Sequence, residues 1–230
     1  MTDFNYNAAQ AAAIDQDIEI VREQLIASAF SGHSLLAEQE RLIETVPLAR
    51  LLFITASLGT YRPDQLRPVA VGLELLRLAA EIHYWGPRTC DDRNLNLVTA
   101  DYYYAYAIKL AATTNVESAI SYMVQAIADI TKGETMPDAS KSYRGASIFE
   151  TAVRLGVRLG ECESAVADTL HAAAVSCCEL YHLQYDEVSD AGAKAEQARS
   201  LKDRALDAAQ ALPAFQAGLL GDLLAAPRYL

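Results

Sequence analysis

The apolar residues of this chain recur every three or four positions over long stretches, which is the period of an amphipathic α-helix. In the segment 14–31, Ile18, Val21 and Leu25 share one face and charged residues occupy the other, so we expect a surface helix with one buried stripe. The segment 34–45 repeats this pattern more briefly. The segment 48–58, LARLLFITASL, is apolar almost all round and therefore predicts a helix at the centre of a bundle.

Helix start and stop signals divide the rest of the chain. Gly59 stands at a C-cap position, and Pro63 opens a helix that continues to Trp85. We then expect a helix that contains Asp101, a helix over 116–131, a break at 133–137, and helices over 143–159 and 164–185. A loop beginning at 191–193 should lead into a helical hairpin over 195–224, broken at Pro213. No strand alternation, repeat or linker interrupts this pattern, so the sequence predicts an all-α fold: a single-domain bundle of about ten helices spanning 1–230.

Composition and charge narrow the classes of function. Of the 230 residues, 52% are hydrophobic, and the formal net charge of −11 argues against binding to a nucleic-acid backbone. No apolar run reaches membrane-spanning length, and the N-terminal segment has no basic region typical of a signal peptide. The four cysteines show no metal-ligand spacing, so we expect reduced thiols and a cytoplasmic protein.

Six segments together resemble one protein family. Their order along the chain is LARLLFITASLGTYRPDQLRPVAVGLELLRLAAEIHYW, TADYYYAYAIKLA, VQAIADITKGE, YRGASIFETAVRLG, LYHLQYDEVSD and ALDAAQALPAFQAGLLGDLLA. They resemble the trans-isoprenyl diphosphate synthases, all-α enzymes that lengthen allylic diphosphates with isopentenyl diphosphate. The resemblance covers nearly the whole chain and implies the isoprenoid synthase fold, in a family that usually dimerises.

The position of the family's first aspartate-rich motif is altered. In the family, this DDxxD motif holds magnesium ions that bridge the allylic diphosphate, because hard divalent cations prefer carboxylate and phosphate oxygens. The motif should follow His83, but the chain has Tyr84-Trp85-Gly86-Pro87 there. Aromatic rings do not coordinate magnesium, and Gly-Pro ends a helix. The nearby pair Asp91-Asp92 is either a displaced clamp or a solvated helix N-cap.

The chain has fewer candidate residues than the family for the remaining contacts to metal and diphosphate. The resemblance places a remnant of the second aspartate-rich motif at Asp186, Glu187 and Asp190, and a second alignment register keeps only Asp186. A solvated helix end is the alternative interpretation of these carboxylates. Arg50 is the one basic residue where the family has a basic segment for isopentenyl diphosphate, and Arg144 lies near the position of a family lysine that contacts diphosphate. Both arginines are candidate substrate-binding residues or ordinary surface residues.

The aromatic and imidazole side chains have structural interpretations. Tyr102, Tyr103, Tyr104 and Tyr106 are either the lining of a prenyl cavity or anchors of the core and of a subunit interface. His83, His171 and His182 show no spacing or carboxylate partner in the sequence that suggests a catalytic base, so we expect structural roles for them.

Three functions compete. The selective loss of motif residues within a well-patterned helical core favours a catalytically silent accessory subunit of a heteromeric isoprenyl diphosphate synthase. Such a subunit would pair with an intact synthase, or with itself, and would need no cofactor alone. The first alternative is a divergent prenyl transferase or terpene synthase that uses magnesium. The second is a module that binds a prenyl chain or another lipid in a leftover apolar cavity.

Overall fold

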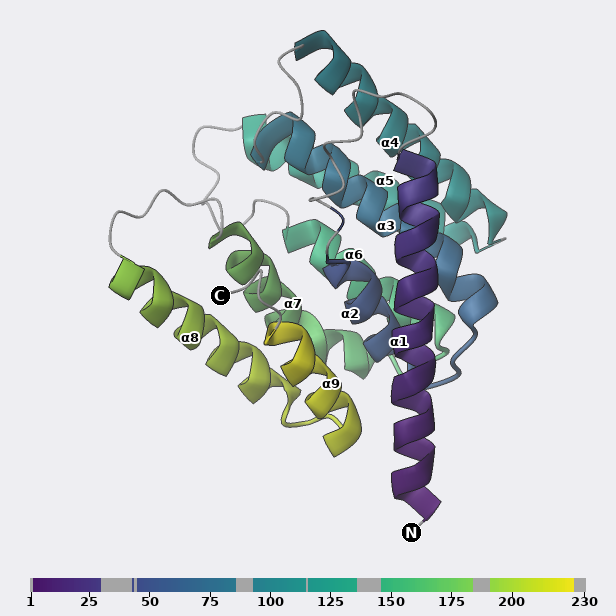
Figure 1. The fold of residues 1–230 in the computed structure, drawn as a ribbon, viewed down its shortest axis with the longest axis vertical. Coiled ribbons are helices and arrows are strands. Elements are labelled where there is room, and N and C mark those ends of the chain that lie inside the picture. Colours follow the sequence, from purple (N-terminus) through teal and green to yellow (C-terminus); the bar gives the residue numbers. More distant parts are fainter. Residues whose placement is uncertain are drawn as a thin grey trace.

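The computed structural model of the chain describes residues 2–29, 43, 45–85, 93–114, 116–135, 146–183 and 191–225. These residues form a bundle of nine α-helices with one π-helical turn and no strand, which confirms the predicted all-α class (Figure 1). The helices are α1 (Thr2–Ala29), α2 (Pro47–Ala56), α3 (Pro63–Ala80), α4 (Arg93–Thr113), α5 (Glu117–Thr135), α6 (Ala146–Leu159), α7 (Ala165–Leu183), α8 (Ala191–Ala209) and α9 (Ala214–Leu224). The π-helical turn, Glu81–Trp85, directly extends α3.

Helix α2 lies at the centre of the bundle, as its apolar sequence predicts. Every residue of α2 except Arg50 is buried, and the helix packs against α1, α3, α6 and α9. Its N-terminus begins with Pro47, and the next two backbone N–H groups donate to a carboxylate oxygen of Glu74 on α3, at 2.7 Å from Leu48 and 2.9 Å from Ala49. A helix leaves its first N–H groups without intrahelical partners, so Glu74 caps α2 from a neighbouring helix.

The contact between α2 and α6 is unusually close because two glycines line it. A Cβ atom added at Gly156 would lie 2.6 Å from the Thr55 Cβ, and one added at Gly160 would lie 2.7 Å from the Ala56 carbonyl oxygen. These distances are too short for any real side chain. Gly160 directly follows the last residue of α6, Leu159, and its N–H still donates to the Gly156 carbonyl oxygen at 2.8 Å. The spacing of four residues therefore keeps both glycines on one face, and the C-terminal end of α6 lies directly on the backbone of α2.

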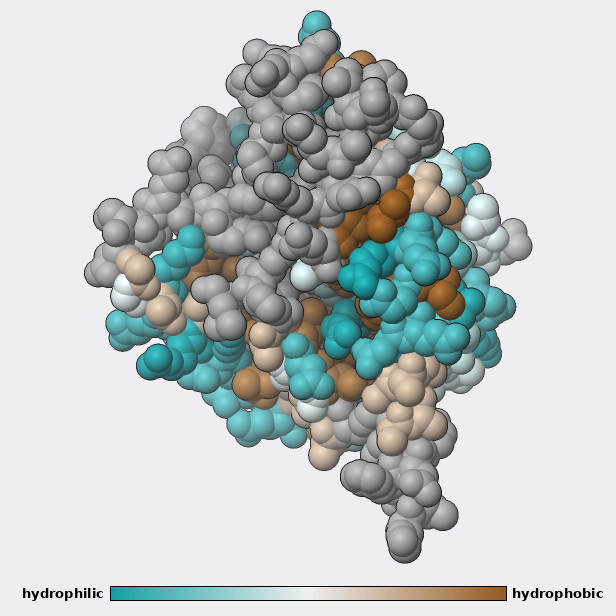
Figure 2. All heavy atoms as spheres, in the orientation of Figure 1, coloured by the Kyte–Doolittle hydropathy of each residue, from teal (hydrophilic) through white to brown (hydrophobic). Residues whose placement is uncertain are grey.

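A partly buried polar cluster ties α1 to α3. The carboxylate of Asp17 on α1 accepts hydrogen bonds from the Tyr61 hydroxyl at 2.6 Å and from Nε of Arg67 at 2.7 Å. Burial raises the pKa of Tyr61 well above its ordinary value, and the hydrogen bond to Asp17 raises it further. The outer face of α1 is polar, and Figure 2 shows hydrophilic residues over the middle of α1 and over α8.

Some predicted boundaries were wrong. Helix α1 begins at Thr2 and not near residue 14, since the Ala-rich segment before Ile14 has a high helix propensity. Helix α5 continues through Gly133 to Thr135, where a break was predicted, and Ala191 begins α8 where a loop was predicted. One glycine near a helix end costs only about 1 kcal/mol, which tertiary packing offsets.

Two further observations complete the fold. Most of the helix predicted over 34–45 lies outside the described residues, of which only 43 and 45 fall in that segment. In the part of the chain that the structure describes, no helix is both long and apolar enough to span a membrane.

Candidate functional site

The family's two metal motifs would lie just beyond the C-terminal ends of α3 and α7. Helix α3 is apolar on most sides, and it ends in the π-helical turn Glu81–Trp85, which contains the position where the first motif should begin. Single π-helical turns are rare and occur often at functional sites. Helix α7 ends at Leu183, immediately before the segment expected to hold the second motif.

The π-helical turn presents aromatic and imidazole groups. Nε2 of His83 lies 3.3 Å from Oδ1 of Asp101 on α4, and the His83 ring stacks on Tyr104 with centroids 5.6 Å apart. Tyr84 is 38% exposed. Burial raises the pKa of Tyr104, and the nearby Tyr84 and Asp101 raise it further. His83 therefore stacks on an aromatic ring and lies beside the Asp101 carboxylate, and these contacts form no carboxylate clamp at the described end of α3.

A buried charged cluster begins in this turn, at Glu81, and extends back along α3. We call its four residues, Glu74, Arg77, Glu81 and Tyr181, the Arg77 cluster. Nε of Arg77 donates to Glu74 at 2.6 Å, and Nη1 donates to Glu81 and, at 2.8 Å, to the Tyr181 hydroxyl on α7. None of the four residues is more than 1% exposed. Burying a charge is costly unless it is paired and hydrogen-bonded, and here every charged group has such partners.

Sequence reasoning missed this cluster, although a signal for it was present. Glu74, Arg77 and Glu81 are spaced three and four residues apart within an otherwise apolar segment. Residues at these spacings share one face of a helix. Three alternating charges on one face of a helix expected to be buried predict an internal ion-pair network.

The described part of the end of α3, through Trp85, has no cluster of carboxylates for a magnesium ion. Its nearby carboxylate, Glu81, is buried and bound to Arg77, and Asp101 lies beside His83. Across the described residues, no three His, Cys, Asp or Glu side chains come together in a way that could hold a metal ion.

The predicted site residues divide into one that is described and six that are not. Nη2 of Arg50 lies 3.0 Å from Oδ1 of Asp15 on α1, so its guanidinium already has a carboxylate partner at the surface. The others lie outside the described residues: Asp91, Asp92, Arg144, Asp186, Glu187 and Asp190. Their proposed roles in binding metal or diphosphate stay predictions.

The tyrosine run of α4 divides between the core and the surface. Tyr103 is fully buried, and its hydroxyl donates to the Ala29 carbonyl oxygen at 3.1 Å, which joins α4 to α1. Tyr102 is 42% exposed and stacks on Tyr106 with ring centroids 5.7 Å apart. Tyr103 therefore anchors the core, as one of the two predicted interpretations has it, and Tyr102 lies at the surface.

Two of the histidines, for which the sequence shows no carboxylate partner, have one in the fold. His83 lies beside Asp101, as described above, and Nδ1 of His171 on α7 lies 3.4 Å from Oε1 of Glu150 on α6. Each pair joins residues that are distant in sequence, so the spacing along the chain did not reveal it.

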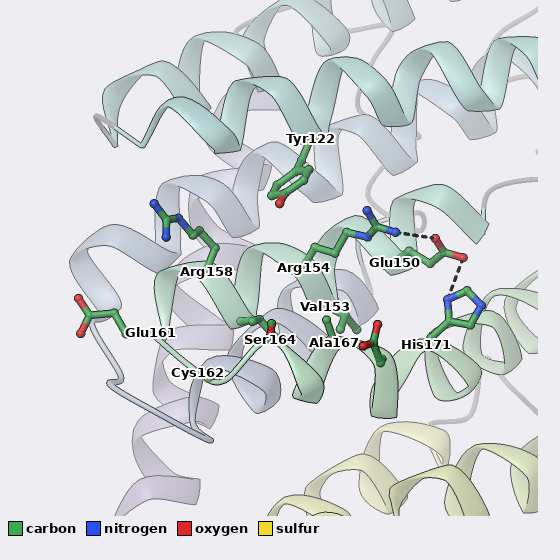
Figure 3. A pocket seen from close by; sticks show the side chains of 12 residues that line it. Tyr122, Glu150, Val153, Arg154, Arg158, Glu161, Cys162, Ser164, Ala167 and His171 are labelled. Carbon is green, nitrogen blue, oxygen red and sulfur yellow. Dashed lines mark ion pairs between the residues drawn. The ribbon is translucent and has the colours of Figure 1, made fainter.

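A surface pocket of about 670 Å³ lies between α5, α6 and α7 (Figure 3). Arg154 and Arg158 of α6 line it together with Tyr122 of α5, and Glu150 pairs there with Arg154 at 4.0 Å and with His171. His171 and Tyr181 are ten residues apart on α7, so the pocket lies about 15 Å along that helix from the Arg77 cluster. Its mixed charges show no preference for an anion or a cation, and it is separate from the motif positions.

Comparison with known proteins identifies the fold. No protein-family model and no curated protein sequence matches the chain. Solved structures do match over almost their whole length. A geranylgeranyl pyrophosphate synthase from Lactobacillus brevis, complexed with citrate, has a TM-score of 0.75 at 14% identity, with 94% of this chain and 96% of that chain covered.

Two further matches are parts of plant enzymes. The geranyl diphosphate synthase small subunit from Antirrhinum majus has a TM-score of 0.64 at 14% identity, with 95% of this chain and 98% of that chain covered. A deletion mutant of the heterotetrameric geranyl pyrophosphate synthase of mint has a TM-score of 0.64 at 17% identity, with coverages of 93% and 98%. The chain therefore has the fold of the trans-isoprenyl diphosphate synthases.

Proposed function

We propose that this chain is a divergent member of the trans-isoprenyl diphosphate synthase family that has lost catalysis and serves as an accessory subunit of a heteromeric synthase. The observation that supports the proposal is the end of α3, where Tyr84 and Trp85 follow His83 at the position where the family's carboxylate clamp is expected to begin. Glu81, the acidic residue of that turn, is engaged by Arg77. Ionising an allylic diphosphate requires compensation for the charge of the leaving group, and metal ions normally supply much of it.

An exposed apolar face on α4 supports a role as a subunit. Val98 is 65% exposed, and Tyr102, four residues further along the same face, is 42% exposed and stacks on the ring of Tyr106. Exposed apolar side chains that cluster together are typical of protein interfaces, where tyrosine is also enriched. We assign this face to an intact isoprenyl diphosphate synthase subunit, because two structural matches are a small subunit and a heterotetrameric enzyme.

The partner assignment is tested by co-expressing the tagged chain with an intact isoprenyl diphosphate synthase. We expect the two proteins to co-purify and the product distribution of the synthase to change. Val98→Glu should weaken the complex at least about thirtyfold, since an unpaired charge buried in an interface costs about 2–5 kcal/mol. Leu206→Glu on α8 is the matched control, because Leu206 is also exposed but lies on another part of the bundle. If Val98→Glu binds as tightly as the wild type, α4 is not the interface.

The proposal that the chain has lost catalysis is tested separately. The purified chain is incubated with magnesium, labelled isopentenyl diphosphate and an allylic diphosphate, and we expect no turnover. Turnover that Asp186→Ala abolishes would favour the divergent enzyme instead and would assign a metal-binding role to the second motif.

A further inference from the structure

We propose that the Arg77 cluster closes the space between α3 and α7 to an isoprenoid chain. This inference deepens the proposed function, because a subunit without turnover has no need to hold a growing hydrocarbon. The two helices lead to the two motif positions, so the space between them is where a chain attached to a clamped diphosphate would begin.

Side chains of both helices fill this space. Helix α3 packs against α1, α2, α4, α5 and α6, whereas α7 packs against α6 and α8. Arg77 reaches from α3 to the Tyr181 hydroxyl on α7 at 2.8 Å, and its guanidinium carbon lies 5.7 Å from the centre of the Tyr181 ring. Phe149 of α6 packs against the same Tyr181 ring, with ring centroids 5.8 Å apart. The near-zero exposure of the cluster shows that no open channel passes these side chains.

The charges make this filling hard to displace. Glu74 is held by Arg77 and by two backbone N–H groups of α2, so moving Arg77 would leave a buried carboxylate without its cation. A hydrocarbon entering here offers no hydrogen bond in return. Separating one partner of a buried ion pair lowers the apparent affinity of an incoming ligand by more than about a hundredfold. An apolar filling of the same size would lack this barrier, because it could shift its rotamers and remain in an apolar environment.

Titration calorimetry with farnesol and, separately, inorganic pyrophosphate tests the inference. Farnesol is a hydrocarbon chain without a diphosphate, so the two probes separate occupation of the interior from binding of the charged head. The double variant Arg77→Ala/Glu81→Ala removes the guanidinium and one carboxylate and retains the Glu74 cap on α2. Arg67→Ala is the matched control, because Arg67 is also an α3 arginine paired with a buried carboxylate, that of Asp17, at the junction with α1.

We expect saturable 1:1 farnesol binding by the double variant, and no detectable binding by the wild type or by Arg67→Ala, whose affinity should be at least about a hundredfold weaker. The affinity for inorganic pyrophosphate should be the same in the wild type and in the variants of the Arg77 cluster. Tyr181→Ala opens the same space from the α7 side with the three charges still paired, and it decides the matter if the double variant does not fold. Farnesol binding by the wild type, or its refusal by folded variants, overturns the inference. If the wild-type chain does not co-purify with a synthase, the proposed function is overturned, but the expected difference in farnesol binding between the wild type and the double variant stays the same.

Discussion

Replacing Gly156 by alanine should destabilise the protein, although the same change elsewhere in a helix stabilises it. The added Cβ would lie 2.6 Å from the Thr55 Cβ and 2.9 Å from the Leu52 carbonyl oxygen. Both atoms are fixed to the α2 backbone, so no rotamer change relieves the contact and α6 must move away from α2. Gly218 on α9 is the matched control, because a Cβ added there meets no atom within 4 Å.

The two substitutions differ only in this contact. Overpacking a core costs about 1–3 kcal/mol and occasionally more, and a backbone contact at both atoms places Gly156 at the upper end. Alanine gains about 1 kcal/mol over glycine in a helix interior, which both variants share. We therefore expect Gly156→Ala to lose about 2 kcal/mol and Gly218→Ala to gain about 0.5–1 kcal/mol in the free energy of unfolding.

Urea unfolding followed by circular dichroism measures both values. For a chain of this length, 2 kcal/mol corresponds to a fall of about 4–8 °C in Tm. A Gly156→Ala variant as stable as Gly218→Ala would refute the close α2–α6 packing.

Other changes have definite expected outcomes. Glu161 has a φ of 54°, which strains any residue with a Cβ, and its ion pair with Arg62 at 2.9 Å is exposed and weak. Glu161→Gly should therefore exceed Glu161→Ala in unfolding free energy by about 1 kcal/mol, since both lose the ion pair and only glycine loses the strain. Equal stabilities in denaturant melts would contradict the left-handed conformation. Burial raises the pKa of the Cys177 thiol from 9.0 to about 12 and raises that of Cys178 as well, whereas Cys162 is only partly buried. Iodoacetamide at pH 8 should thus modify Cys162 before the other two, as peptide mass spectrometry would show, and rapid modification of Cys177 would contradict its burial. The fold favours the protonated form of the Cys177 thiol, so this preference contributes fully to the free energy of unfolding below pH 9. The contribution should decline as the pH rises from 9 towards 12, which unfolding experiments at stepped pH would detect.

The sequence determined the helical framework because its signals are local. The period of apolar residues predicted α2 as the central helix, and Pro63 and Pro213 marked where helices begin. Boundaries failed where local and tertiary signals conflict, as at Gly133, which packing retains inside α5. The order of the six segments that resemble the isoprenyl diphosphate synthases also led to the correct fold, since the solved structures that match the chain have that fold.

From the residue types that follow His83, the sequence predicts that the first motif position has no carboxylate clamp. Which groups meet at the end of α3 was decided only by the tertiary structure. Arg77 and Tyr181 are 104 residues apart in the sequence, so no local pattern relates them, and their hydrogen bond forms only because folding brings these two side chains together. In the same way, Asp15 engages Arg50 from α1, and Asp101 reaches His83 from α4. Helix formation depends on neighbours along the chain, whereas pairing of charges depends on distance in space, and only folding brings those groups together.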